Sequence, residues 1–332
     1  MDDLPIGSRV SLRRRLAPEE VTPEYSMTDV TGQLVDADET HLWVETRRGR
    51  VQVARADLVA ARVVPPRPAR RGAPHRAVGI GDLQRIMTKG QPGIEQEWLG
   101  EEYHGWLLRS AGRWTGRSNS VLTVGEPGLP LEEAVAAVEH WYADREAPAL
   151  FMLPRPTGAG AAEDPLGELL LDRGFVESPP VDVLTGRVSD LVVAGGQPPG
   201  LRLATSPTPG EDWLRGCGPR LQEHLGTARR VLTIPRRQVF LTAHDDEGGV
   251  VGVVRVAMDD AWAGIFGLHV APERRREGTG RWLTREAALA IQAAGTDLVY
   301  LQVERDNAPA RSLYTALGME VHHEYAYLRP PR

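Results

Sequence analysis

The stretch Leu268-His269-Val270-Ala271-Pro272-Glu273-Arg274-Arg275-Arg276-Glu277-Gly278-Thr279-Gly280-Arg281 decides how the second half of this chain folds. The apolar run at 265–268 predicts a buried strand, and the apolar spacing at 282–291 predicts a helix. Glycines in the loop between them let the backbone approach an anion, and the amides of the first helical turn are free to bind it. We therefore predict that this stretch binds the pyrophosphate of a cofactor.

The composition is that of a globular protein with more than one core. The chain has 332 residues, of which 41% are hydrophobic, and a net charge of −6. This acidic balance argues against a dedicated nucleic-acid-binding protein. Cys217 is the single cysteine, so we expect neither a disulfide framework nor a thiolate metal site, and we predict no metal. Because the chain has no signal-like start and no apolar run of about 18 residues, we expect a cytoplasmic protein that does not bind a membrane.

Residues 1–66 predict a small all-β barrel. Apolar and polar residues alternate at 8–13 and 41–46, and Gly49 marks a turn into another short strand. Small barrels of this kind serve as adaptor modules, so we expect a protein partner here rather than a nucleic acid. The run Arg13-Arg14-Arg15 either contacts an acidic partner or forms a solvated strand end. Residues 67–78, rich in proline and arginine, predict a linker.

Residues 79–192 and 200–332 predict two α/β domains of the same order. In both, a helix, an apolar strand and a helix that ends in glycine and an apolar residue precede a further strand; 170–175 parallels 313–319. This pattern indicates a diverged duplication. In the first copy, prolines at 125–130 remove backbone amides, and Glu132 and Glu133 occupy the positive end of the helix. We therefore expect only the second copy to bind pyrophosphate.

The stretch 112–120 between these features is unusual for a strand connection. It contains Arg113, Trp114, Arg117 and Asn119. Such side chains either line a substrate groove or form an exposed polar turn, and the sequence leaves both interpretations open.

The second copy resembles the GNAT superfamily of acetyl-CoA-dependent N-acetyltransferases over about residues 200–332. The matching residues are Leu268 to Val270 with Pro272, the Arg275-x-x-Gly278-x-Gly280 loop, and Asn307 followed by Tyr314. The resemblance implies the fold class: an α/β (α+β) chain of two tandem GNAT-like mixed-sheet domains, the first degenerate, preceded by the small barrel.

The resemblance also implies a role for each matching residue. The main chain at 268–270 would pair with the pantetheine arm of acetyl-CoA, and the loop would surround its pyrophosphate. Asn307 would hydrogen-bond near the pantetheine arm, and Tyr314 would protonate the departing CoA thiolate, since a phenol is protonated at neutral pH. The implied cofactor-binding residues are Leu268, His269, Val270, Arg275, Arg276, Glu277, Gly278, Thr279, Gly280, Arg281 and Asn307.

The general base is not where many relatives have it. The two positions that often carry a glutamate hold Gln302 and Gly264. Glu304 lies on the same strand face as Gln302, because strand side chains alternate, and it is our candidate base. His269 is an alternative that more often packs, and His322 and His323 are further alternatives expected to be exposed; a water chain to bulk solvent is another.

We therefore expect an N-acetyltransferase that moves an acetyl group from acetyl-CoA to a primary amine by direct attack. The missing acids at positions 264 and 302 leave one rival interpretation, a non-catalytic acyl-CoA-binding adaptor or sensor. The amine acceptor is a small molecule or a basic peptide tail, and the oligomeric state stays open.

Overall fold

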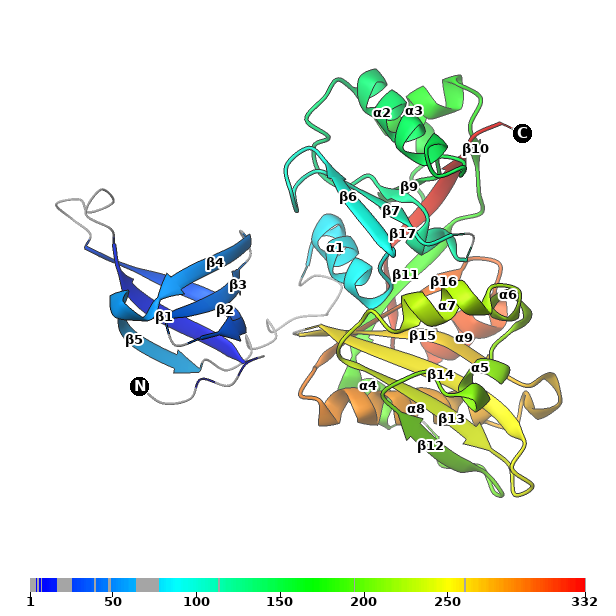
Figure 1. Cartoon of the computed structure of the whole chain (residues 1–332). Coiled ribbons are helices and arrows are strands. Elements are labelled where there is room, and N and C mark those ends of the chain that lie inside the picture. The colour runs from blue at the N-terminus through cyan, green and yellow to red at the C-terminus, as the bar shows by residue number, and fades with distance from the viewer. Residues whose placement is uncertain are drawn as a thin grey trace. The chain divides into compact units, whose positions relative to one another are not determined.

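The computed structural model describes residues 4, 6, 8–16, 26–38, 40–46, 49–63, 78–112, 114–193, 195–259 and 261–331 (Figure 1). The chain divides into two compact units, residues 1–68 and 69–332. The predicted linker at 67–78 lies outside the described residues except for Val78. Among the described residues, no helix is both long and apolar enough to cross a membrane.

The first unit is a five-stranded antiparallel sheet in the order β4-β3-β2-β1-β5. Its elements are β1 (Arg9–Arg15), β2 (Met27–Ala37), β3 (His41–Thr46), β4 (Gly49–Ala54), the 3-10 turn η1 (Arg55–Asp57) and β5 (Leu58–Val63). Alternating side chains such as Val10 and Leu12 are buried in one core. The predicted all-β unit is confirmed. Arg13 makes a two-point ion pair with Asp29 on β2, at 2.8 and 2.9 Å, so this arginine serves the sheet itself.

The second unit is built on one 12-stranded sheet in the order β12-β13-β14-β15-β16-β11-β17-β9-β8-β7-β6, with β10 paired to β17 (Figure 1). Its first half comprises α1 (Ile80–Gly90), β6 (Glu95–Leu99), β7 (Trp106–Ser110), η3 (Gly116–Ser118), β8 (Val121–Leu122), α2 (Leu131–Ala143), β9 (Phe151–Arg155), η4 (Ala161–Glu163), α3 (Pro165–Asp172), β10 (Val176–Glu177), β11 (Val181–Arg187) and α4 (Val188–Val192). Its second half comprises β12 (Arg202–Ser206), α5 (Glu211–Arg215), α6 (Pro219–Gln222), α7 (Leu225–Leu232), β13 (Gln238–His244), β14 (Val250–Asp259), β15 (Trp262–Val270), η5 (Pro272–Arg274), α8 (Thr279–Ala293), β16 (Leu298–Glu304), α9 (Ala308–Ala316) and β17 (Glu320–Arg329).

Each half of this unit places its last strand against the other half. β11, the last strand of the first half, is antiparallel to β16 of the second half along its whole length. β17, the last strand of the second half, is antiparallel to β9 of the first half, and β11 and β17 pair with each other at the centre. Neither half therefore forms a complete sheet from its own strands. Buried backbone amides and carbonyls need hydrogen-bond partners, and the exchanged strands β11 and β17 supply them. The regions predicted as separate domains at 79–192 and 200–332 therefore share one sheet.

The helices lie on two faces of the sheet. Tyr325 on β17 packs in the core under α1, whereas Leu328 packs in the core under α2 and α3 on the opposite face. Tyr300 and Leu301 on β16 divide in the same way, between α1 on one face and α8 and α9 on the other. The first-half helix α1 contacts β9 of its own half and β14 and β15 of the other. α1 therefore lies across the junction of the two halves.

Candidate functional site

The parallel pairing of β15 and β16 ends early. It runs only from Trp262↔Leu298 to Gly264↔Tyr300. Gly267 then adopts a left-handed φ of 60°, which glycine tolerates without strain, and His269 and Val270 remain paired only with β14. Among the residues that the structure describes, the edge of β15 that faced β16 thus has no strand partner at residues 268–270. An extended ligand chain can add to such an edge through main-chain hydrogen bonds.

The loop after β15 exposes backbone amides at the start of α8. Arg276 (φ 67°) and Gly278 (φ 86°) are both left-handed, and Gly278 caps the helix. In the described part of the chain, the amides of Thr279 and Gly280 donate no hydrogen bond, and the first helical bond runs from the Trp282 amide to the Gly278 carbonyl at 2.9 Å. Free amides at a helix start attract anions.

The side chains of the loop leave it positively charged. Arg274 pairs with Glu277 at 2.9 Å, which neutralises the one acid of the segment 274–281. Among the residues that the structure describes, Arg275, Arg276 and Arg281 form no ion pair with a carboxylate. The Arg275 guanidinium donates to the Val270 carbonyl at 3.0 Å. Arg275 thus occupies the Val270 carbonyl, a main-chain acceptor at the end of β15.

The corresponding position in the first half differs. α2 follows Pro130 and carries Glu132 and Glu133 in its first turn, whereas the first turn of α8 contains no acid. A carboxylate pair at a helix start occupies the region where an anion would bind. This difference is the physical basis for expecting a single anion site.

Helix α9 lies next to the loop. A Cβ atom on Gly280 would lie 3.8 Å from Leu313 of α9. Asn307 caps α9, because its Oδ1 accepts a hydrogen bond from the Ala310 amide at 3.2 Å, which leaves its NH2 group to donate elsewhere. Tyr314 is 5% exposed, and burial raises the pKa of its phenol above the ordinary value near 10. Its hydroxyl therefore stays protonated throughout the physiological range.

The residues at the expected base positions have other surroundings. Gln302 accepts hydrogen bonds from Arg117 Nε at 2.6 Å and from the Tyr325 hydroxyl at 3.0 Å. A Cβ atom on Gly264 would lie 2.4 Å from the Phe266 ring, so no side chain fits there. Glu304 is exposed at the end of β16, on the same face as Gln302.

The histidines expected to be exposed include one that is buried. His323 is fully buried: its Nε2 lies 2.7 Å from the Gln84 amide nitrogen, and its Nδ1 lies 2.8 Å from Nδ1 of His322. The expectation of exposure is wrong for His323, because α1 covers this part of β17. Burial lowers the pKa of His323 to about 3, and burial also lowers the pKa of His269. Neither ring competes well for a proton at neutral pH.

A small polar hollow that is not apparent from the sequence lies beside Gln302. It has a volume of about 10 Å³, room for about one water molecule. Its lining comes almost entirely from the first half: Gln84, Met87, Thr88, Gln91, Arg109, Arg117 and Met152, together with Gln302. The one sign of this hollow in the sequence is Arg109, a lone arginine within the apolar strand 106–110.

The stretch 112–120 reaches this hollow through Arg117. The interpretation as an exposed turn is wrong for the described residues, since Trp114, Ser118 and Ser120 are buried. Asn119 holds the loop together by accepting from the Ala111 amide and donating to the Trp114 carbonyl. Trp114 packs against second-half residues of α5, α7 and β13, which fixes the loop across the junction.

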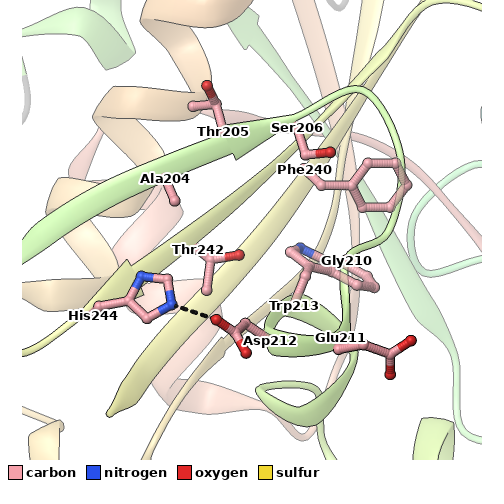
Figure 2. A pocket seen from close by; sticks show the side chains of 10 residues that line it. All are labelled: Ala204, Thr205, Ser206, Gly210, Glu211, Asp212, Trp213, Phe240, Thr242 and His244. Atoms are coloured by element: carbon pink, nitrogen blue, oxygen red, sulfur yellow. Dashed lines mark hydrogen bonds and ion pairs between the residues drawn. The ribbon is translucent and has the colours of Figure 1, made fainter. Parts of the chain in front are cut away.

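A larger pocket of about 330 Å³ lies at the sheet edge, between β12, β13 and α5 (Figure 2). His244 Nε2 lies 3.1 Å from Asp212 Oδ2 within it. Asp212 also pairs with Arg215, and Glu211 pairs with Arg229. Its charged groups thus satisfy one another, and none of the predicted site residues lines it.

Two family models together cover most of the chain. The model described as "Probable histone acetyltransferase Rv0428c C-terminal" matches residues 78–328, and the model described as "Rv0428c N-terminal Sm-like domain" matches residues 4–62. The chain is 23% identical over 254 residues to the Bacillus subtilis protein named "Uncharacterized N-acetyltransferase YobR", covering 75% of this chain and 97% of that protein.

Solved structures share the fold. A GCN5-related N-acetyltransferase from Kribbella flavida superposes with a TM-score of 0.54 at 18% identity, covering 76% of this chain and 96% of that one. A tandem GNAT protein from the clavulanic acid biosynthesis pathway superposes with a TM-score of 0.53 at 16% identity, covering 68% of this chain and 78% of that one. The chain therefore belongs to the family of the probable histone acetyltransferase Rv0428c C-terminal domain, has the fold of GCN5-related N-acetyltransferases, and carries a Sm-like domain at its N-terminal end.

Proposed function

We propose that this chain transfers an acetyl group from acetyl-CoA to a primary amine, and that acetyl-CoA binds at the end of β15 and the start of α8. The observation that carries this proposal is the combination, within the described chain, of the free amides of Thr279 and Gly280 with the unpartnered strand edge at 268–270. The amides and the loop arginines suit a pyrophosphate, and the strand edge suits an extended amide-bearing arm.

The residues around this site suit the chemistry of acetyl transfer. Acetyl-CoA supplies an activated thioester. Tyr314, which holds its proton at neutral pH, donates that proton to the thiolate that leaves, while the free NH2 of Asn307 binds near the pantetheine arm. Together with the main chain at 268–270, these groups orient the thioester.

The acceptor amine must lose a proton before it attacks. For an amine with a pKa near 10.4 this costs about 4–5 kcal/mol at pH 7. Glu304 is the carboxylate on the same face of β16 as Gln302, and we assign it as the group that accepts the proton. Its exposed position lets the proton pass on to solvent water.

We further propose that residues 79–192 are a degenerate GNAT-like copy that binds no acetyl-CoA. Its parallel strand pair β8 and β9 and its helix α2 occupy the places that β15, β16 and α8 occupy in the second half. Its helix start carries Glu132 and Glu133 in the first turn, where α8 carries no acid.

A Gly280→Asp variant tests the cofactor site. An aspartate in the first helical turn favours the helix, because it complements the helix dipole, but it repels a pyrophosphate. We expect the Kd for acetyl-CoA to rise by about 100-fold, which corresponds to about 2.7 kcal/mol, with no loss in Tm. Gly280→Ala is the matched control, because its Cβ would meet only ordinary contacts at 3.7 and 3.8 Å. Equal affinity in both variants, measured by calorimetry, would place the cofactor elsewhere.

A second function is favoured by one observation. No carboxylate stands at positions 264 and 302, where relatives often carry a base, and Phe266 and Tyr300 fill the space at Gly264. A chain that binds acetyl-CoA without acetylating any amine in a broad screen would be an acyl-CoA-binding adaptor rather than an enzyme.

A further inference from the structure

Three arginines are buried on the face of the sheet that α1 covers: Arg109, Arg117 and Arg255. Arg109 and Arg255 are 2% and 1% exposed, and Arg117 is half-buried. Within the described chain, none of the three forms an ion pair with a carboxylate. A guanidinium removed from water without a counterion is costly, and burial lowers the pKa of Arg109 and, to about 10, that of Arg255.

On the opposite face of the same sheet, arginines are paired with carboxylates. There Arg155 pairs with Glu324 at 3.1 Å, and Arg305 pairs with both Glu324 and Asp182. Arg311 adds a further contact to Asp182 at 3.0 Å. On that face, the arginines that join the two halves are paired with carboxylates. The unpaired arginines under α1 therefore require a different explanation.

Arg255 has substitutes for a carboxylate. Its guanidinium lies over the Phe266 ring at 4.4 Å, donates to the Gly90 carbonyl at 2.8 Å and donates to Gln238 at 3.1 Å. These contacts join α1 to β14 and β15, so Arg255 serves the packing of the junction.

Arg109 and Arg117 are different, because both line the hollow beside Gln302. Arg109 donates to the Ser120 carbonyl and hydroxyl, at 3.0 and 2.9 Å, and these two bonds fix the orientation of its guanidinium group. Arg117 donates through Nε to Gln302 and Tyr325. The remaining members of the lining are amides, a hydroxyl and two methionines, none of which carries negative charge.

The hollow lies beside the reacting centre that we assign. Gln302 is the next residue on its strand face after Tyr300, the last residue of β16 that pairs with β15. Glu304 follows Gln302 on the same face and lies near enough to attract Arg117 electrostatically without forming an ion pair. Arg117 and the Glu304 carboxylate thus attract each other from the Gln302 face of β16.

We propose that Arg117, with Arg109 behind it, binds a carboxylate of the acceptor, and that the acceptor is a small amine carrying that carboxylate, such as an amino acid. One carboxylate oxygen takes the water-sized hollow, and the amine lies toward Glu304. An arginine fork recognises a planar carboxylate through paired charge-assisted hydrogen bonds. This inference rests on the proposed acetyl transfer, and it gives the first half a role: it supplies the acceptor subsite.

The test compares ligands that differ in one group. L-lysine and cadaverine differ only by the carboxylate, and phosphoethanolamine and ethanolamine supply the corresponding pair for phosphate. Binding to the full chain in the presence of CoA is measured by ligand-observed NMR, and acetylation is measured in parallel. We expect L-lysine to bind about tenfold to hundredfold more tightly than cadaverine, the range expected for hydrogen bonds to a charged group.

Two variants and a control sharpen the result. Gln302→Glu supplies an internal counterion to Arg117 with little change of shape, so it should abolish the preference without unfolding the chain; Arg117→Gln should abolish it as well. Arg173→Gln removes a surface arginine that pairs with Glu139, and it should keep the preference.

Several results would overturn the inference: equal binding of L-lysine and cadaverine, an unchanged preference in Gln302→Glu, or tighter binding of phosphoethanolamine than of L-lysine. Acetylation of both amines at equal rates would refute this inference and leave the proposed function standing. A carboxylate preference without acetylation of any amine would refute the proposed acetyl transfer and leave the carboxylate-binding site standing.

Discussion

A Tyr314→Phe variant is expected to lose about 10²- to 10⁴-fold in kcat while its Kd for acetyl-CoA stays unchanged. The phenol is buried against α8 and the sheet, and its raised pKa keeps it a proton donor at any physiological pH. Phenylalanine preserves the packing and removes only the hydroxyl. The loss should therefore appear in the chemical step, measured as turnover with an identified amine.

The control is Tyr103→Phe, which removes a hydroxyl from an exposed tyrosine of the first half that packs beside Trp98. That variant should match the wild type in kcat. If Tyr314→Phe also stayed within about threefold of wild type, Tyr314 would be a core residue without a part in the reaction, and water would be the proton donor.

The two halves of residues 69–332, expressed separately, are expected not to fold. A fragment of residues 78–193 lacks β17, so β9 keeps an open edge and the core under α1 loses Tyr325. A fragment of residues 195–332 lacks β11, which pairs with the whole of β16. Unpaired strand edges and exposed core side chains make such fragments prone to aggregate.

Circular dichroism and thermal unfolding check this prediction. The 69–332 fragment should unfold cooperatively, since it retains every strand of the sheet, whereas each half alone should show no cooperative transition. Mixing the halves during refolding should restore the transition. A stable, monomeric 195–332 fragment with full acetyl-CoA affinity would show that the exchanged strand is dispensable.

The strand, glycine-containing loop and helix at 265–291 could be predicted from the sequence because their determinants are local. Glycines, a strand before them and a helix after them lie within about thirty residues, and the structure places Gly278 and Thr279 at the helix start as that pattern requires. The five strands of the first unit follow from local alternation in the same way.

The exchange of β11 and β17 could not be predicted, because it depends on which distant edge each strand meets. The residues of β11 and β17 predict strands, but a strand pattern is the same whichever half the strand completes. The burial of His323 follows from the same long-range arrangement, since α1 covers it from 239 residues away, through Gln84.

The hollow at Arg117 was equally hidden from local patterns. Arg117 meets Gln302, 185 residues later in the chain, and Arg109 sits in an apolar strand where its neighbours suggest only packing. The role of a buried arginine depends on whether a carboxylate lies beside it. Only the fold shows which side chains surround it.

The number of acetyl-CoA molecules bound per chain tests the central claim most directly. Calorimetry on the full chain should give one acetyl-CoA per chain, because the first turn of α8 carries no acid, whereas Glu132 and Glu133 in the first turn of α2 would repel a pyrophosphate. Two acetyl-CoA molecules per chain, or one whose binding is unaffected by Gly280→Asp, would contradict the account.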